Sequence, residues 1–513
     1  MLTTLAAPAF AGTWYIEDGD ITVKVGETGN DVTQNNVTTK NDTDTIITNQ
    51  KTDTASSNTV TIEAKDKDDK VEVTLDNVNI KADSGSALTS KGDVTLALNG
   101  DNHLTGGISG TGNYGRNGIA STGSLTISGG ENDSLTAQGG SGEDGGDGIF
   151  SKDLTISGGT VTATGGGSTG SDRPCGYGIF STNTTTISGG TVTATGGDST
   201  GSYSSGGYGI YSSGVTISGG TVTANGGSGK DGSGDGIFSF DPVAISGGTV
   251  TAKGGSGEDG SGGRGIISTK SVTISGGTVN ANGGSGKNGN GGSGIIGSGR
   301  VAVSGGTVNA AGGDGGNGKD GGDGIYSSDI DLSGSLELTA KAGSPNGKAL
   351  SQKGSELVLD TIKDKLGPGA KVTATDADGK VIDQVPTPRP VEPEGPVIPE
   401  ESSSSSDGGS ATPSAPVSPL PGLTVTDKDG QRISYTSTQS GNALTVCVGR
   451  LTASFRISLA ALRQLRAEGI EAITFQTILC STTLSLDELL AMGGEDAEAV
   501  LTHRFTDSSL TVG

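Results

Sequence analysis

The sequence predicts an all-β fold: a right-handed parallel β-helix with coils of about 29 residues, followed by a small C-terminal α+β domain. Three observations support this: a glycine motif recurs at nearly constant spacing, apolar and polar residues alternate within each repeat, and glycine is abundant. Of 513 residues, 95 are glycine, 30% are hydrophobic and 3% are aromatic. So few apolar residues are typical of a disordered chain, but a disordered chain has no reason to space them regularly. The regular spacing is therefore the stronger signal.

The repeat is marked by the sequence Ile-Ser-Gly-Gly or a close variant. Consecutive markers begin 28 to 31 residues apart, and a Gly-Ile pair recurs in step with them. A repeat of this length forms one turn of a solenoid, because each unit buries its apolar face only against its neighbours. The eight markers begin at Ile127, Ile156, Ile187, Ile217, Ile245, Ile274, Val303 and, in a degenerate copy, Leu332.

Each repeat predicts three short strands. In GIFSKDLTISGGTVTATGG, a polar residue separates Leu154 from Ile156 and another separates Val161 from Ala163. This alternation is typical of a strand with one buried face, and the Gly-Gly pair between the two strands permits a tight corner. No repeat has a stretch of helical period, and β-branched residues and glycine disfavour helix. Right-handedness follows from the general rule for parallel crossovers.

Composition divides the chain into four segments. Residues 1–11 end in the small-x-small pattern Ala9-Phe10-Ala11 and read as a signal-peptide remnant; a short disordered N-terminus is the alternative. Residues 12–385 are expected to hold the β-helix, with irregular first coils and a closing hairpin at 371–385. Residues 386–421 are rich in proline and serine, which predicts an extended linker.

Residues 422–513 are expected to form the small α+β domain. A helix at 459–468 begins at the N-cap Ser458, and a second begins at the capping box of Ser485 and Glu488. Cys447 and Cys480 both lie in this segment. A disulfide between them is one possibility, and two free thiols are the other.

The charge balance narrows the class of partner. Lys and Arg number 33 against 57 Asp and Glu, so the net charge is -24. Such a chain repels nucleic acid and anionic membranes and favours cations or neutral polymers as partners. No stretch approaches the roughly 18 apolar residues of a membrane span.

Glycine-rich acidic loops join the repeats and match the first six positions of the calcium-binding nonapeptide GGxGxDxUx. If these loops stack in register, their carboxylates repel one another unless a cation such as calcium neutralises them. The alternative is a solvated loop in which neighbouring lysines balance the acids. The predicted calcium ligands are Asp144, Asp231, Asp259, Asn288 and Asp320.

A ladder of apolar side chains follows the Gly-Ile pairs. Strict alternation points these side chains outward, as a stripe on which sugar rings can stack. The alternative is that the chain bends there and the rings tuck under the glycine loops as core. The candidate carbohydrate-binding residues are the ladder members Phe150, Phe180, Tyr211, Phe238 and Tyr326 and the neighbouring Tyr177, Tyr208 and Arg264.

A second ladder consists of outward threonines, from Thr160 to Thr307. Regular threonine arrays occur on ice-binding solenoids, but threonine is also an ordinary residue for a solvent-facing strand. The ordinary reading is preferred.

The runs WYIEDGDITV, VTLDNVNI and DVTLALNGDNHLTGG, together with the repeated LTISGGTVTA, give the chain a family resemblance. It resembles clostridial extracellular β-helix proteins described as carbohydrate-binding domains, over roughly residues 12–360. This resemblance implies a pectate-lyase-like solenoid, calcium near a groove, and plant polysaccharides such as polygalacturonate as ligands.

The leading hypothesis is therefore a secreted, non-catalytic, polysaccharide-binding protein. A structural or adhesive stalk that spaces the C-terminal domain from a cell surface is the second. A calcium-dependent polysaccharide lyase using Arg264 is the third. The sequence contains no Ser-His-Asp, HExxH or P-loop motif to favour catalysis.

Overall fold

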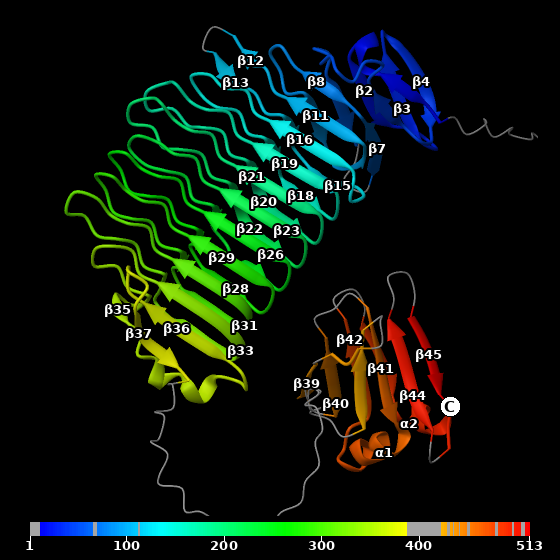
Figure 1. Ribbon diagram of the computed structural model, residues 1–513. Coiled ribbons are helices and arrows are strands. Elements are labelled where there is room, and N and C mark those ends of the chain that lie inside the picture. The colour runs from blue at the N-terminus through cyan, green and yellow to red at the C-terminus, as the bar shows by residue number, and fades with distance from the viewer. Residues whose placement is uncertain are drawn as a thin grey trace, which may run out of the picture. The chain divides into compact units, whose positions relative to one another are not determined.

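The computed structural model describes residues 11–64, 69–110, 113–386, 422–427, 431–433, 435–440, 442–448, 452–477, 481–494, 497–503 and 508–512. The chain forms two compact units, Met1–Glu392 and Pro393–Gly513. The first is a parallel β-helix of about 14 turns, which confirms the predicted fold class (Figure 1). Most of the expected signal remnant, the linker from 387 onward and Cys480 lie outside the described residues.

Each coil contributes one strand to each of three parallel faces, because two corners, the second of them at the Gly-Gly pair, and one long loop break the chain. The first face contains β6 (Val60–Glu63), β9 (Leu88–Lys91), β14 (Ile119–Ser121), β17 (Ile149–Ser151), β24 (Ile237–Ser239), β27 (Ile266–Ser268), β30 (Ile295–Gly297), β32 (Ile325–Ser327) and β34 (Leu350–Gln352).

The second face contains β1 (Thr13–Tyr15), β5 (Ile46–Thr48), β7 (Lys70–Asp76), β10 (Asp93–Asn99), β15 (Ser124–Ser128), β18 (Asp153–Ile156), β25 (Val243–Ile245) and β28 (Ser271–Ile274). The long strands β20 (Ile179–Ile187) and β22 (Ile210–Ile217) run through the first corner and belong to both faces.

The third face contains β8 (Asn79–Lys81), β11 (Asp101–Thr105), β16 (Ser134–Gln138), β19 (Thr160–Thr164), β21 (Thr191–Thr195), β23 (Thr221–Asn225), β26 (Thr249–Lys253), β29 (Thr278–Asn282) and β36 (Lys371–Thr375). The strands β31 (Arg300–Ala311) and β33 (Ile330–Lys341) run through the second corner and join the second face to the third.

Identical or similar residues stack on one another along the axis. Ile179 pairs with Ile149 on one side and Ile210 on the other, and Val192 lies between Val161 and Val222. The inward side chains form a continuous apolar core, while the outward threonines are partly or, as at Thr221, fully exposed. All five predicted core residues of the typical repeat are at most 1% exposed: Ile149, Leu154, Ile156, Val161 and Ala163.

A buried serine follows the outward side chain of the first face in most coils. Its hydroxyl satisfies backbone carbonyls at the first corner. Ser239, for example, donates to Ser213 O at 2.8 Å or Asp241 O at 2.7 Å, and Ser327 donates to Gly297 O or Asp329 O at 2.7 and 2.9 Å. Buried carbonyls need such partners, so this column of buried serines stabilises the corner.

The glycine content has a specific structural cause at the long loops. Each long loop has an outgoing limb, which leaves the third face, and a returning limb, which leads to the first face of the next coil. One glycine on each outgoing limb and one on each returning limb form a single chain of backbone hydrogen bonds of 2.7–3.0 Å along the axis. At these positions a side chain has no room: a Cβ on Gly284 would lie 1.8 Å from the carbonyl oxygen of Gly255. We call this chain the glycine spine: Gly140, Gly146, Gly166, Gly176, Gly197, Gly207, Gly227, Gly234, Gly255, Gly263, Gly284, Gly292, Gly313, Gly322 and Gly343.

Antiparallel elements close the ends of the β-helix. At the start, β3 (Asn30–Gln34) and β4 (Val37–Asp42) form a hairpin on β2 (Ile21–Val25), and the buried Asp42 accepts hydrogen bonds from Trp14 Nε1 and Gly12 N at 2.8 and 2.9 Å. At the other end, β36 and β37 (Val381–Val385) form the predicted closing hairpin, and β35 (Ser355–Glu356) folds back on β34. These pairings cover strand edges that would otherwise template association. A further hairpin, β12 (Ile108–Ser109) with β13 (Tyr114–Gly115), lies in the loop between β11 and β14.

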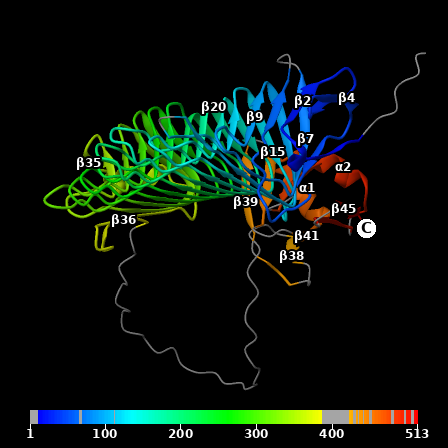
Figure 2. The ribbon, with the colours of Figure 1, turned by 90° about the horizontal axis from the view of Figure 1, so that it is seen from above.

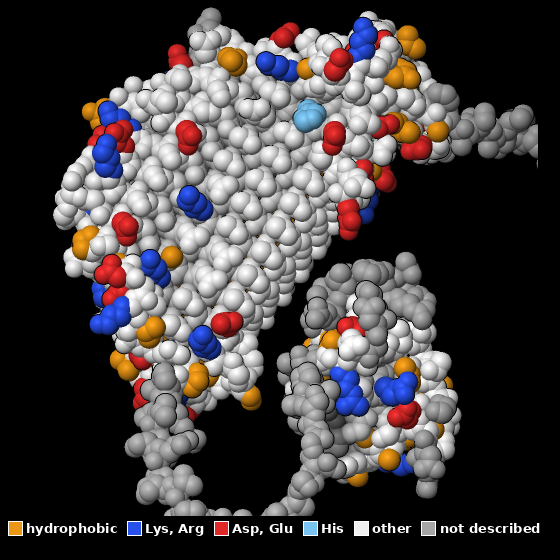
Figure 3. Space-filling model, viewed as in Figure 1, with side chains coloured by type: hydrophobic (Ala, Val, Ile, Leu, Met, Phe, Trp, Pro, Cys, Tyr) orange, Lys and Arg blue, Asp and Glu red, His pale blue; other side chains and the backbone are white. Residues whose placement is uncertain are grey.

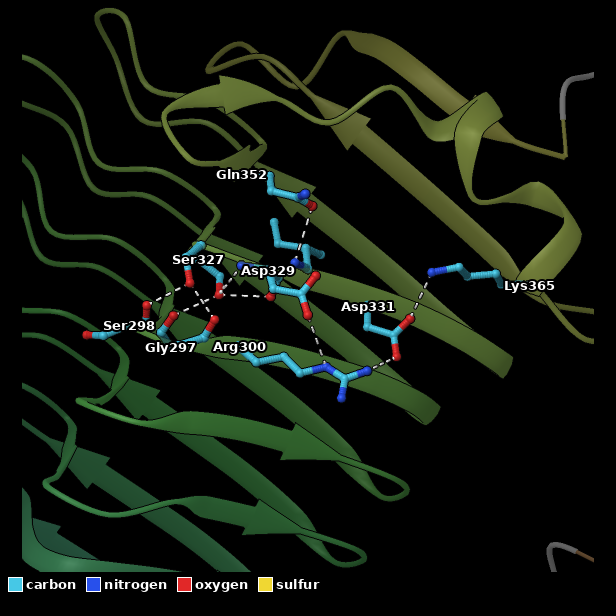
Figure 4. A network of polar contacts seen from close by, with 11 residues as sticks. Gly297, Ser298, Arg300, Ser327, Asp329, Asp331, Gln352 and Lys365 are labelled. Atoms are coloured by element: carbon cyan, nitrogen blue, oxygen red, sulfur yellow. Dashed lines mark hydrogen bonds and ion pairs between the residues drawn. The ribbon is translucent and has the colours of Figure 1, made fainter.

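A network of polar contacts ties the last coils together (Figure 4). Arg300 pairs with Asp329 at 3.4 Å and also with Asp331, both on the next coil. Lys365, in a short 3-10 helix at Lys363–Lys365 that follows one at Leu359–Thr361, reaches Asp331 at 3.4 Å. These pairs are largely exposed, so they direct the closing segment more than they stabilise it.

The second unit is α+β, as expected. Its sheets are β38 (Leu423–Thr426), β41 (Ala453–Ser458), β44 (Glu498–His503) and β45 (Ser508–Val512), and β39 (Thr436–Ser440), β40 (Ala443–Cys447), β42 (Ala472–Gln476) and β43 (Ser481–Ser485). Ser458 caps α1 (Leu459–Ala467) and Ser485 caps α2 (Leu486–Ala491), which confirms both predicted helix starts. No helix among the described residues is long and apolar enough to cross a membrane.

The glycine spine generates a prediction about stability. Gly284→Ala places a methyl group against the Gly255 carbonyl, and we expect a loss of about 3 kcal/mol, because overpacking forces backbone shifts. Gly85→Ala is the matched control: nothing lies within 4 Å of a Cβ built there. The control is expected to unfold at or slightly above the parent's midpoint. Circular dichroism melts of the three proteins give the comparison, and equal midpoints would contradict a packing role for the spine.

Candidate functional site

The loops between the third face and the first face of the next coil are the most elaborate part of the β-helix. They extend together from one side of the solenoid in Figure 1. Each has an outgoing limb that begins at a Gly-Gly pair and a returning limb that ends at the Gly-Ile pair. The glycine spine joins the two limbs of each loop and the loops of successive coils, so the loops stack as ordered layers.

Aromatic side chains from four consecutive coils form one cluster beside the returning limbs. Ring centroids of neighbouring pairs lie 5.0–5.6 Å apart, in both stacked and edge-to-face arrangements that favour aromatic contact. The two members on the returning limbs, Tyr177 and Tyr208, stack against each other at 5.2 Å. We call these seven rings the ring cluster: Phe150, Tyr177, Phe180, Tyr208, Tyr211, Phe238 and Phe240.

The ring cluster agrees in part with each of the two alternatives that the sequence left open, an outward stripe and a set of buried rings. The strand members point away from the core, as alternation predicts, yet most rings are half-buried because they cover one another. Burial raises the pKa of the Tyr177 phenol, and it raises that of Tyr208 to about 12, so both remain neutral donors. Phe240, 46% exposed, was not predicted; it stands two residues after Phe238, at the corner that follows β24.

Tyr326 is separated from the ring cluster. It is 39% exposed and stacks on Ile296, and Ile267 lies between Ile296 and Phe238. The predicted stripe is thus continuous in register but aromatic over only part of its length.

In several coils the residue before the Gly-Ile pair is polar and bonds to a neighbouring coil. We call these residues the polar column: Asn117, Asp147, Asp235, Arg264, Ser293 and Asp323. Asn117 accepts a hydrogen bond from Asp147 N at 2.7 Å, and Asp147 in turn accepts one from Tyr177 N at 2.8 Å. Asp323 accepts one from Lys348 N at 2.8 Å in the same way. These bonds hold the returning limbs, and therefore Tyr177, in place relative to the preceding coil.

Two carboxyls of this column have perturbed acidity. Burial raises the pKa of Asp147 to about 7, against the lowering effect of the bond from Tyr177 N. Burial also raises the pKa of Asp235, which is fully buried, to about 6, opposed by the charge of Arg264. Buried charge is disfavoured, so both groups bind protons more readily than an exposed aspartate.

Arg264 is held by Asp235. The arginine backbone N donates to Asp235 Oδ1 at 2.6 Å, and the guanidinium lies 3.7 Å from Oδ2. The buried Asp235 carboxyl pairs with the guanidinium of Arg264. Arg264 stands before a Gly-Ile pair and is therefore a member of the polar column. The geometry gives Arg264 a positioning role in the coil.

A hollow of about 240 Å³ lies on the returning limbs of two successive loops, beside Tyr177 and Tyr208. Tyr203 stands at its edge, 76% exposed, with a backbone φ of 59°. A bulky residue in this left-handed region costs about 1–2 kcal/mol, and such strain is retained mostly at functional sites. The sequence offered no signal for Tyr203, because the strain arises from the loop conformation. The lining residues are Asp172, Arg173, Pro174, Cys175, Tyr177, Tyr203, Ser204, Ser205, Gly206 and Tyr208.

The outgoing limbs carry most of the predicted calcium ligands, and the structure corrects their register. Gly229, Gly257, Gly286 and Gly315 pair in succession. This register places Asp231, Asp259 and Asn288 in one column, followed by Asn317, whose amide donates to Asn288. Asp320 is displaced because the motif at 315–320 lies three residues beyond the point where its loop aligns with the others. The prediction that Asp320 continues the column is therefore wrong.

The acids of this column already have protein partners. Asp259 accepts from Asn288 Nδ2 at 2.9 Å, and Asp231 accepts from Tyr203 N at 2.5 Å. Glu258 pairs with Lys287 at 3.1 Å beside an open groove of about 650 Å³. Asp144 instead faces Arg173 at 3.6 Å. Calcium takes six to eight oxygen ligands, and within the described ranges no cluster of three or more acidic, His or Cys side chains could hold a metal.

The third face differs from the loops in its small number of charged side chains. In Figure 3, the surface over its strands carries few charged side chains, whereas charged side chains gather near the loops. The outward threonines stack in register from Thr160 to Thr307. In the view of Figure 2, the solenoid is seen from above with its stacked coils side by side.

Comparison with known proteins supports the repeat architecture. Five segments, 154–179, 186–210, 215–237, 243–266 and 272–295, match a family model described as beta helix repeat. These segments contain both limbs of five complete loops and, of the ring cluster, Tyr177 and Tyr208. Searches of curated proteins and of solved structures found no match. The chain is thus a β-helix repeat protein, and the clostridial resemblance remains a hypothesis.

The acidity of Asp147 predicts a pH dependence. Its folded pKa, about 7, exceeds the ordinary value of 3.8, so its ionisation disfavours folding and stability falls as pH rises from about 4 through 7. Asp147→Asn keeps an acceptor for Tyr177 N but cannot ionise. We expect the drop in melting temperature between pH 5 and pH 8 to be smaller in this variant than in the parent. Asp378→Asn, at an exposed position, is the control and should leave the drop unchanged.

The loop geometry predicts the response to calcium. Because Asp231 and Asp259 are partnered within the protein, we expect millimolar calcium to raise the melting temperature by no more than about 2 °C relative to chelator. The double variant Asp231→Asn with Asp259→Asn should respond like the parent. A large rise in the parent that this double variant loses would establish the calcium site instead.

Proposed function

We propose that the protein is a secreted, non-catalytic polysaccharide-binding protein whose β-helix holds a polymer chain along the ring cluster. The observation that carries this proposal is the ring cluster itself. Seven aromatic rings lie outside the core on four consecutive coils, next to loop limbs rich in serine and glycine. Aromatic faces with adjacent hydrogen-bonding groups are suited to sugars, whose faces are apolar and whose edges are polar.

The direction of the ring cluster favours a polymer over a compact ligand. The strand members occupy equivalent positions in successive coils, so the cluster runs along the solenoid axis. Consecutive coils are about 4.8 Å apart, which gives an extended ligand several contacts in line. A stripe of this kind distributes binding over several weak contacts.

The charge of the chain bears on the kind of polymer. With a net charge of -24, the protein repels polyanions such as polygalacturonate unless cations lie between them. A neutral polysaccharide agrees better with this charge than the pectin-like ligand implied by the clostridial resemblance. Extracellular location rests on the Ala9-Phe10-Ala11 pattern and on the proposed class of ligand, a polysaccharide.

The function is tested by removing the flat rings while keeping apolar volume. The triple variant Phe180→Leu, Tyr211→Leu and Phe238→Leu is expected to bind polysaccharide at least about tenfold more weakly, because stacking faces are lost. The control is Ile267→Leu with Ile296→Leu, on the same column of the first face. Affinity electrophoresis through gels that contain xylan, mixed-linkage β-glucan, galactomannan or polygalacturonate measures binding.

Melting temperatures accompany each variant, so that misfolding is distinguished from loss of contact. Unchanged migration of the parent in every gel would contradict the proposal and favour the stalk. A rise in ultraviolet absorbance from unsaturated products on pectin would favour the lyase.

A further inference from the structure

We propose that the hollow on the returning limbs, at Tyr203, binds one uncharged pyranose unit of the polysaccharide, with the Tyr203 ring against the sugar. This inference rests on the function proposed above and names the ligand class and a specific contact. It departs from the sequence-based candidates, which did not include Tyr203.

The conformation of Tyr203 is the first argument. Among the residues that the structure describes, ten non-glycine residues have positive φ, and eight of them are asparagine or aspartate, which tolerate this conformation. The equivalent residue on the preceding loop is Asp172, with φ 57°. Tyr203 adopts φ 59° with a large side chain that is 76% exposed and adds little burial. A requirement for its ring in contact with a ligand explains why an easier residue does not stand there.

The loop tip is held in place, which is the second argument. Tyr203 N donates to Asp231 on the following loop at 2.5 Å. The neighbouring Ser204 is buried and donates to Gly170 O on the preceding loop at 3.0 Å. The tyrosine therefore stands on a backbone fixed to the loops on both sides, and a ligand meets a preformed contact.

The chemistry of the hollow indicates a sugar. Three tyrosines, Tyr177, Tyr203 and Tyr208, line the hollow, and the polar residues Ser205 and Asp172 lie at the same hollow. Flat apolar surface beside several donors and acceptors suits a pyranose better than a purely apolar molecule. Its volume of about 240 Å³ is below the range of about 300–1,000 Å³ typical of whole small-molecule sites, so we infer that it takes one unit of a longer chain.

The charges at the hollow indicate an uncharged unit. Its charged residues are one acid, Asp172, and one base, Arg173. Arg173 is engaged by Asp144 at 3.6 Å and lies over the Tyr114 ring, 5.6 Å from its centroid. This arginine is therefore already paired with a carboxylate, and the negative net charge of the chain further disfavours a uronate.

The experiment removes the Tyr203 ring while relaxing the backbone. Tyr203→Asn suits the left-handed conformation, so we expect a melting temperature equal to or above that of the parent. We expect its dissociation constant for the bound neutral polymer to rise about tenfold in the full chain. Tyr203→Phe keeps the ring and should stay within about twofold of the parent. The matched control is Tyr15→Asn, at a 38% exposed tyrosine on the first coils, which should leave binding unchanged.

The outcomes separate this inference from the proposed function. Parent-like binding by Tyr203→Asn, with loss in the triple ring variant, would overturn the role of the hollow and leave polysaccharide binding intact. Binding of the parent to polygalacturonate but to no neutral polymer would overturn the uncharged class. If the parent binds none of the polymers, both proposals fail.

Discussion

The parallel pairing of each coil with the next is the interaction on which the rest of this structure depends. A single coil cannot satisfy its backbone hydrogen bonds or bury its five inward side chains, so both depend on its neighbours. Pairing in register brings Ile179 between Ile149 and Ile210 and Val192 between Val161 and Val222. Because the repeat stacks like on like, a narrow core forms from a sequence that is only 30% hydrophobic.

The same register extends into the loops through the glycine spine. Loops of this length are usually mobile, but here the two limbs of each loop bond to each other and to the adjoining loops through glycine amides. Close approach of these backbones leaves no room for side chains, as at Gly284. The abundance of glycine, which in other contexts indicates disorder, therefore produces order here. Rigid loops in turn give Tyr177, Tyr203 and Tyr208 defined positions.

Polar side chains inside the stacked coils mainly form hydrogen bonds with the backbone. The column that contains Asn117, Asp147 and Asp323 caps backbone amides of the next coil, and the buried serines satisfy carbonyls at the first corner. Where the column holds a carboxyl, burial raises its pKa, and Asp235 is further matched by Arg264. Acidic and basic side chains in these positions are therefore better explained by construction of the coil than by catalysis. The chemistry left for a ligand lies in the aromatic rings and the loop hydroxyls.

The sequence by itself determined the β-helix, its coil length, the inward residues and both helix caps of the second unit, because these depend on periodicity and local hydrogen bonding. It also identified the ladder that contains Phe180 and Tyr211, since alternation assigns their face. Only the tertiary structure decided that the rings half-bury one another, that Asn317 rather than Asp320 follows Asn288, and that Tyr203 is strained and exposed. Those features depend on contacts between coils, where backbone pairing at Gly286 and Gly315 overrides a motif match, and no single repeat encodes them.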